Sequence, residues 1–138
     1  MSMSTKPRLV RVLENNRDFA VYTTASDADA LHIDSTDYAE SCSRCDYAIR
    51  VSPLNPRHFF FVELKGNDVV KAAKQLVCSI EHLKSLYKDY SIRQAWVISG
   101  GWRPAVKTSF QIQKAKAKKH NFLLQHRTRS MTVDLTRL

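Results

Sequence analysis

The feature that most constrains the fold is the aromatic and β-branched run Phe59–Val62, which continues into Glu63, Leu64 and Lys65. Aromatic and β-branched residues favour strands, and their density here predicts a strand that is buried on at least one face. Because side chains alternate across a strand, we expect Glu63 and Lys65 on one side and Leu64 on the other. The run therefore predicts a core strand with two charged residues near its end.

A second short strand is predicted just upstream, at Asp46–Val51. The stretch between the two strands is short and rich in turn residues, so the strands should pair as antiparallel neighbours. We expect Arg50 to lie opposite Phe59. In that register Asp46 lies opposite Glu63, with the two Cβ atoms about 4.5–5.5 Å apart. Carboxylates that close repel each other unless a cation lies between them, and Mg²⁺ is held by one or two carboxylates plus waters.

A helix is predicted after this strand, with Asn67 as its N-cap and Asp68 favourably placed for the helix dipole. Apolar residues at helical spacing mark its core face, which comprises Val69, Ala72, Ala73, Leu76, Ile80 and Leu83. Gln75 borders this face on the turns nearest the charged strand, where it is either plain polar surface or a side chain directed toward the carboxylates. The run Ile92–Ser99 predicts the next strand, in the same sheet.

Other elements are predicted near both ends of the chain. Four more runs have strand composition, at Leu9–Leu13, Phe19–Thr23, Phe122–Arg127 and Met131–Leu135. Residues 25–44 are acidic with weak periodicity and predict a loop or a short helix. Arg103 and Pro104 begin a predicted helix, because proline is favoured in the first turn. Trp96 lies within a strand and is expected in the core.

Taken together, Cys45-Asp46, the run Val62-Glu63-Leu64-Lys65-Gly66 and the helix with Gln75 resemble the PD-(D/E)xK, or restriction-endonuclease-like, nuclease superfamily, in particular its small Holliday-junction-resolvase-like members. Cys45 stands where the family name has proline. The resemblance implies an α/β fold with a mixed central β-sheet flanked by helices, as one domain over residues 1–138 with its core at about 42–127. It also implies a metal-dependent nuclease that uses Mg²⁺ or Mn²⁺.

The resemblance assigns a role to each site residue. Asp46, Glu63 and the backbone carbonyl of Leu64 would bind the metal, Lys65 would help to activate the attacking water, and Gln75 would support the site. The alternative is a catalytically inactive module that keeps this fold and binds nucleic acid or protein. An intact acidic pair beside a lysine favours the enzyme, because a module that only binds has no need for opposed carboxylates.

The charge distribution points to a polyanionic partner. The net charge is +9, and residues 1–66 contribute −1 whereas residues 67–138 contribute +10. Basic surfaces bind nucleic-acid backbones, and we expect DNA rather than RNA. The candidate contacts are Lys71, Lys74, Trp102, Arg103, Lys107, Lys114 and Lys118. Trp102 follows two glycines and would stack on a base, while Lys107, Lys114 and Lys118 form one helical stripe. A solvated lysine face is the plainer alternative.

The remaining features bear on location and assembly. No apolar run approaches the about 20 residues that cross a bilayer, and no signal-peptide segment is present, so a cytoplasmic protein without membrane contact is expected. Three cysteines in such a protein predict free thiols. Cys42 and Cys45 have the spacing of half a zinc site, but no second pair completes it. The resemblance allows a homodimer.

Overall fold

The structure, a computed structural model, describes residues 6–14, 16–33, 45–52, 56–64, 68–100 and 107–136. Its elements, in chain order, are β1 (Arg8–Glu14), β2 (Arg17–Thr23), β3 (Asp29–His32), β4 (Tyr47–Val51), β5 (His58–Glu63), α1 (Val69–His82), α2 (Lys84–Tyr87), β6 (Ile92–Ser99), α3 (Lys107–Lys118), β7 (Phe122–Thr128) and β8 (Ser130–Asp134). The chain is therefore a mixture of helices and strands, as predicted.

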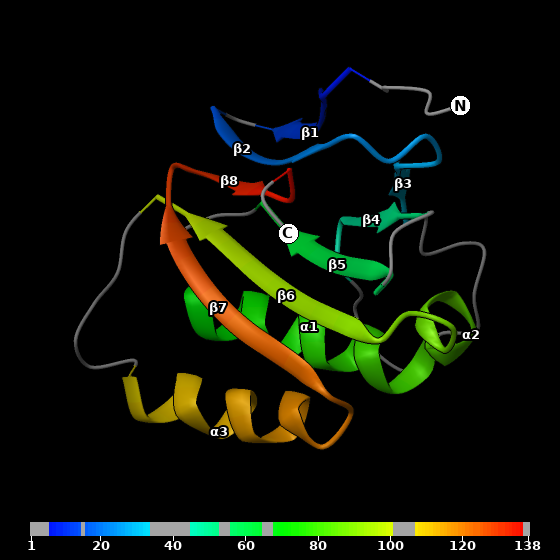
Figure 1. Ribbon diagram of the computed structural model, residues 1–138. Coiled ribbons are helices and arrows are strands. Elements are labelled where there is room, and N and C mark those ends of the chain that lie inside the picture. Colours follow the sequence, from blue (N-terminus) through cyan, green and yellow to red (C-terminus); the bar gives the residue numbers. More distant parts are fainter. Residues whose placement is uncertain are drawn as a thin grey trace.

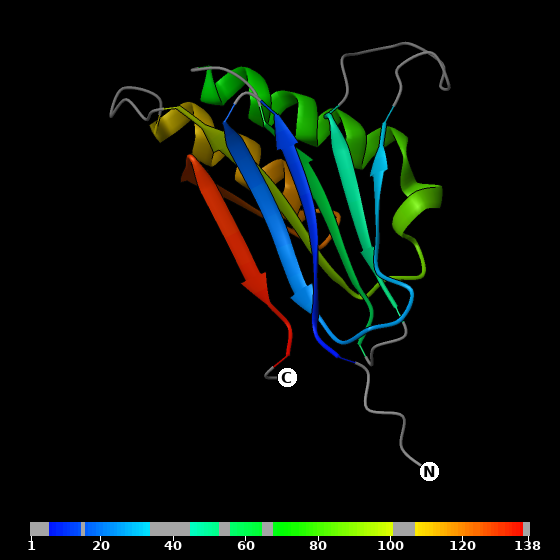
Figure 2. The same cartoon turned by 90° about the horizontal axis from the view of Figure 1, so that it is seen from above.

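The strands form two mixed sheets. One has five strands in the order β3-β4-β5-β6-β7, and the other has three in the order β1-β2-β8. Helices α1 and α3 cover one face of the five-stranded sheet, and the three-stranded sheet lies over its other face (Figure 1; Figure 2). The mixed sheet with helices packed against it was expected. The second sheet, in place of helices on the far side, was not.

Strand β5 lies in the middle of the five-stranded sheet, and all six of its residues are buried. Its neighbours are β4, which is antiparallel to it, and β6, which is parallel. Phe59 and Phe61 point into the core beneath α1, whereas Phe60 and Val62 point into the core between the two sheets. A strand covered on both faces has no solvent side, which explains why the sequence is continuously apolar instead of alternating.

The predicted register of the β4–β5 hairpin is confirmed. Arg50 pairs with Phe59, and Ala48 pairs with Phe61. Asp46 directly precedes β4, so one further step in the same register places it opposite Glu63. The sequence could specify this register because a slip of one residue would turn the buried residues of β4 to the wrong core.

The first third of the chain is partly as predicted. Strands β1 and β2 lie where strands were predicted and pair as an antiparallel hairpin, and β8 joins β2 in parallel. Strand β3, within the stretch predicted to be a loop or short helix, was missed. Three of its four residues are exposed, and the fourth is half-buried. An edge strand with so little burial has no hydrophobic alternation by which it could be recognised.

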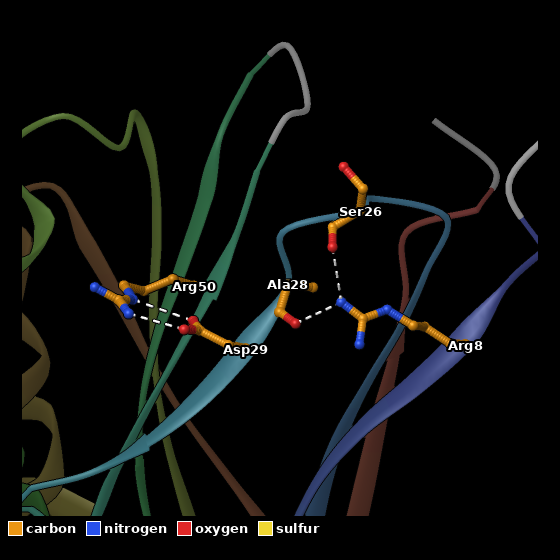
Figure 3. A network of polar contacts seen from close by, with 5 residues as sticks. All are labelled: Arg8, Ser26, Ala28, Asp29 and Arg50. Atoms are coloured by element: carbon orange, nitrogen blue, oxygen red, sulfur yellow. Dashed lines mark hydrogen bonds and ion pairs between the residues drawn. The ribbon is translucent and has the colours of Figure 1, made fainter. Parts of the chain in front are cut away.

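Polar contacts tie β3 into this framework (Figure 3). Arg8 of β1 donates hydrogen bonds to the backbone carbonyls of Ser26 (3.2 Å) and Ala28 (2.6 Å), just before β3. Arg50 of β4 makes a bidentate ion pair with Asp29 of β3, at 3.2 and 2.8 Å. Both members of that pair are solvent-exposed, so it is worth at most about 1 kcal/mol.

Helix α1 buries the predicted face, since Val69, Ala72, Ala73, Leu76, Ile80 and Leu83 are all in the core under the five-stranded sheet. Its N-cap is Asp68, whose Oδ1 accepts a hydrogen bond from the Lys71 backbone at 2.9 Å, so the prediction of Asn67 was one residue early. Trp96 is buried as expected. None of the helices in the described ranges is long and apolar enough to cross a membrane.

Candidate active site

The predicted carboxylates lie at the end of the β4–β5 hairpin, where they hydrogen-bond across the two strands. The backbone N–H of Asp46 donates to Glu63 Oε1 at 2.9 Å, and the backbone N–H of Leu64 donates to Asp46 Oδ2 at 3.3 Å. Both residues share a face with Ala48 and Phe61, which pack beneath α1. The structure therefore brings Asp46 and Glu63 together on the helix-covered side of the sheet.

Both carboxylates are removed from solvent. Glu63 is 0% exposed and Asp46 is 8% exposed. Burying a charged group is costly unless hydrogen bonds or an opposite charge compensate for it. The two backbone hydrogen bonds occupy Oε1 of Glu63 and Oδ2 of Asp46.

Cys45 and Ser79 connect this hairpin end to α1. Ser79 Oγ accepts a hydrogen bond from the Cys45 backbone at 2.9 Å and donates one to the Gln75 carbonyl at 3.1 Å. Ser79 is fully buried. The contact fixes the residue next to Asp46 against the helix. Gln75 is half-buried, as expected of a boundary position, and takes part here through its backbone.

Cys45, the described member of the predicted half zinc site, does not have the properties of a zinc ligand. Cys45 is buried and free, and burial, with smaller contributions from the charges of Glu63 and Asp46, raises the pKa of its thiol far above the ordinary value. A thiol held protonated in this way is a poor metal ligand. Cys78 is disulfide-bonded, so the prediction that all three cysteines are free thiols was wrong. Cys42 lies outside the described residues.

The predicted cationic and stacking residues are only partly described. Lys65, Trp102 and Arg103 lie outside the described residues, as does the side chain of Lys107. On α1, Lys71 and Lys74 are exposed.

Lys114 is half-buried and Lys118 is exposed on α3, where both line a hollow of about 600 Å³ beside β7. The helical rise puts Lys118 about 16 Å along the axis from Lys107. The three positions of the predicted stripe therefore span the whole length of α3.

Sequence reasoning missed a second polar pair on the same face of the sheet. Ser99, at the end of β6, has its Oγ 2.6 Å from Nε2 of His126 on β7. Val97 pairs with both Glu63 and His126, so this pair lies beside the carboxylates. Burial and, secondarily, the charge of Arg127 lower the pKa of His126. The signal available in the sequence was that parallel strands bring polar residues near their carboxyl ends to one edge.

The chemistry of the donor set decides which metal fits. Carboxylate and carbonyl oxygens from Asp46, Glu63 and Leu64 are hard ligands that suit Mg²⁺ or Mn²⁺, with waters filling the other positions. Within the part of the chain that the structure describes, no group of three or more His, Cys, Asp or Glu side chains is placed to hold a metal. The donor set of Asp46, Glu63 and Leu64 thus suits a hydrated Mg²⁺ or Mn²⁺ ion.

Comparison of the chain with protein-family models, curated proteins and solved structures finds no match. The resemblance to PD-(D/E)xK nucleases therefore depends on the residues quoted above and on the geometry in which the chain places them.

Proposed function

We propose that the protein is a metal-dependent nuclease with a restriction-endonuclease-like core. The observation that supports this most directly is the confirmed β4–β5 register, which sets Asp46 opposite Glu63 at the hairpin end with reciprocal backbone hydrogen bonds. The strand that carries Glu63 leads into α1 and then into the parallel strand β6. This is the order of elements that the resemblance requires around such a pair.

Each residue of the site has a defined task in this proposal. Asp46, Glu63 and the Leu64 carbonyl would hold Mg²⁺ or Mn²⁺, which supplies a Lewis acid and lowers the pKa of bound water. Lys65 would position or deprotonate the attacking water and offset negative charge on the phosphate. Ser79 keeps Cys45, and with it the adjacent Asp46, against α1. Gln75 would support the site from the same helix.

The proposed substrate is DNA, held by the basic second half of the chain. Lys71 and Lys74 on α1 and Lys114 and Lys118 on α3 belong to the two helices that cover the carboxylate-bearing face. Phosphate contacts position a backbone without reading its sequence, so cleavage without strong sequence preference is expected. A cytoplasmic location and a homodimer belong to the same proposal.

The test is cleavage of labelled single-stranded, duplex and branched DNA, and of RNA, with Mg²⁺ or Mn²⁺ against EDTA. Glu63→Gln keeps the shape and an acceptor oxygen but removes the charge, so it should lower cleavage at least about 100-fold. Glu81→Gln, at an exposed position on α1, is the matched control and should cleave like the wild type. Cleavage that survives in EDTA, or that Glu63→Gln retains in full, would refute the proposal.

A second candidate is a nuclease-fold module that binds nucleic acid or protein without cleaving. The complete burial of Glu63 favours it, because a buried acceptor that holds the Asp46 backbone can serve the hairpin alone. This candidate predicts salt-sensitive DNA binding that EDTA leaves unchanged, no cleavage with either metal, and no loss of affinity in Asp46→Asn.

A further inference from the structure

A line of polar side chains crosses the helix-covered face of the five-stranded sheet, from the candidate carboxylates to β7. Glu63 pairs with Val97, and Val97 pairs with His126, so the three residues occupy one row. Ser99 lies two residues beyond Val97 on the same face, which makes it a diagonal neighbour of Glu63 and of His126, at about 7–8 Å. Ser99 Oγ lies 2.6 Å from His126 Nε2, which connects the last two polar residues of the line.

The surroundings of His126 suit a group that exchanges protons with solvent. Ser99 is fully buried, whereas His126 is half-buried. The Phe110 ring of α3 lies 6.4 Å away in a T-shaped arrangement. Burial, and to a smaller extent the charge of Arg127, lowers the pKa of His126. A neutral imidazole has a nitrogen that accepts a proton.

The carboxylate end of the line needs such an acceptor. When water attacks a phosphodiester, one of its protons must leave the site. A lysine in its ammonium form has three donors and no lone pair, so in that form Lys65 would orient the water and leave the proton to another group. Carboxylates that hold a metal are weak bases. A histidine with a pKa near or below neutrality is an effective base at neutral pH.

We propose that Ser99 and His126 form a proton relay that serves the nuclease site, with His126 as the terminal acceptor. The oxygen of water bonds to phosphorus, and the bond from phosphorus to the leaving oxygen breaks. The water proton passes to Ser99 Oγ as the Ser99 hydroxyl proton passes to His126 Nε2. His126 then releases a proton to solvent, and the leaving oxygen takes one up from solvent.

Because this relay rests on the proposed nuclease function, the test must separate the two. In the metal-dependent cleavage assay, His126→Gln should lower kcat about 100-fold, while its affinity for an uncleaved oligonucleotide in EDTA stays at the wild-type value. Ser99→Ala leaves the ring in place and should lower kcat about 10-fold. The matched control is His120→Gln, at the half-buried histidine in the turn after α3, which should behave like the wild type.

Two further readouts separate a proton-transfer role from a structural one. The rate of the wild type should fall as the pH drops through the pKa of His126, and this limb should be absent in His126→Gln. Added imidazole should restore part of the rate in His126→Ala. In EDTA and without substrate, the NMR titration of the His126 ring should show a pKa below the ordinary value, and Ser99→Ala should shift it.

The outcomes divide cleanly. A wild type that does not cleave with metal overturns the nuclease function and the relay together. Cleavage that persists in folded His126→Gln with an unchanged pH profile overturns the relay alone. Equal losses in His126→Gln and His120→Gln would also overturn it, since they would show a general effect of losing a histidine.

Discussion

Replacing Ser79 by alanine tests whether α1 holds the acidic hairpin end in place. The substitution removes the acceptor of the Cys45 backbone N–H. Cys45 is only 1% exposed, so water cannot replace that acceptor. Leaving a buried donor unsatisfied costs about 1–3 kcal/mol. Alanine is the better helix former by about 0.5 kcal/mol, which offsets part of this loss. We therefore expect a net destabilisation of about 1–2 kcal/mol.

Urea denaturation measures this directly. With a slope of about 2 kcal/mol per M, the midpoint should fall by about 0.5–1 M with the slope unchanged. Ser85→Ala, at an exposed position on α2, is the control and should leave the midpoint where it is. Amide hydrogen exchange at Cys45 should accelerate in Ser79→Ala. A midpoint within about 0.2 M of the control, with the Cys45 amide still protected from exchange, would show that the Ser79 contact does not stabilise this end of the hairpin.

Two further predictions follow from the electrostatics. His58 is buried, neither ring nitrogen has a hydrogen-bond partner among the described residues, and burial lowers its pKa. The unfolded chain therefore binds the proton more tightly, so the stability that the neutral ring contributes is present above about pH 6.5 and is lost as the pH falls through the folded-state pKa. Urea midpoints at neutral and mildly acidic pH should differ less in His58→Phe than in the wild type, and an unchanged difference would contradict this. The double charge reversal of Lys114 and Lys118 to glutamate should reduce the slope of log affinity against log salt for DNA by about 1.5–2, whereas the same change at exposed Lys84 and Lys88 should not.

What could be predicted from the sequence was local or strongly periodic. The β4–β5 register followed from two short strands, a brief turn and the need to keep apolar residues inside. Helix α1 followed from its apolar spacing. Strand β3 could not be predicted because its pairing with β4 leaves most of its side chains in solvent. The sheet formed by β1, β2 and β8 depends on contacts between the two ends of the chain, which no local pattern contains.

The candidate site divides in the same way. Asp46 and Glu63 are 17 residues apart and lie on one hairpin, so strand alternation sufficed to bring them together. Ser99 and His126 are 27 residues apart and meet only through the parallel register of β6 and β7. A register across a helical connection is set by packing of the whole sheet, and neither residue stands in a pattern that specifies it. Ser79 was missed because a serine on a core face is usually just a small buried residue.

The two backbone hydrogen bonds that the acidic pair accepts do not by themselves require that Asp46 and Glu63 be charged. The hydrogen bonds from the Asp46 and Leu64 backbones need acceptor oxygens, and asparagine or glutamine would supply them. Amides in these places would avoid the desolvation penalty of two buried carboxylates, and replacing buried charges by uncharged groups of the same shape is often neutral or stabilising. Glu63→Gln keeps the acceptor oxygen for the Asp46 backbone and should therefore remain folded while it loses cleavage. A charge that is required for activity, where an amide would supply the same hydrogen bond, serves the reaction.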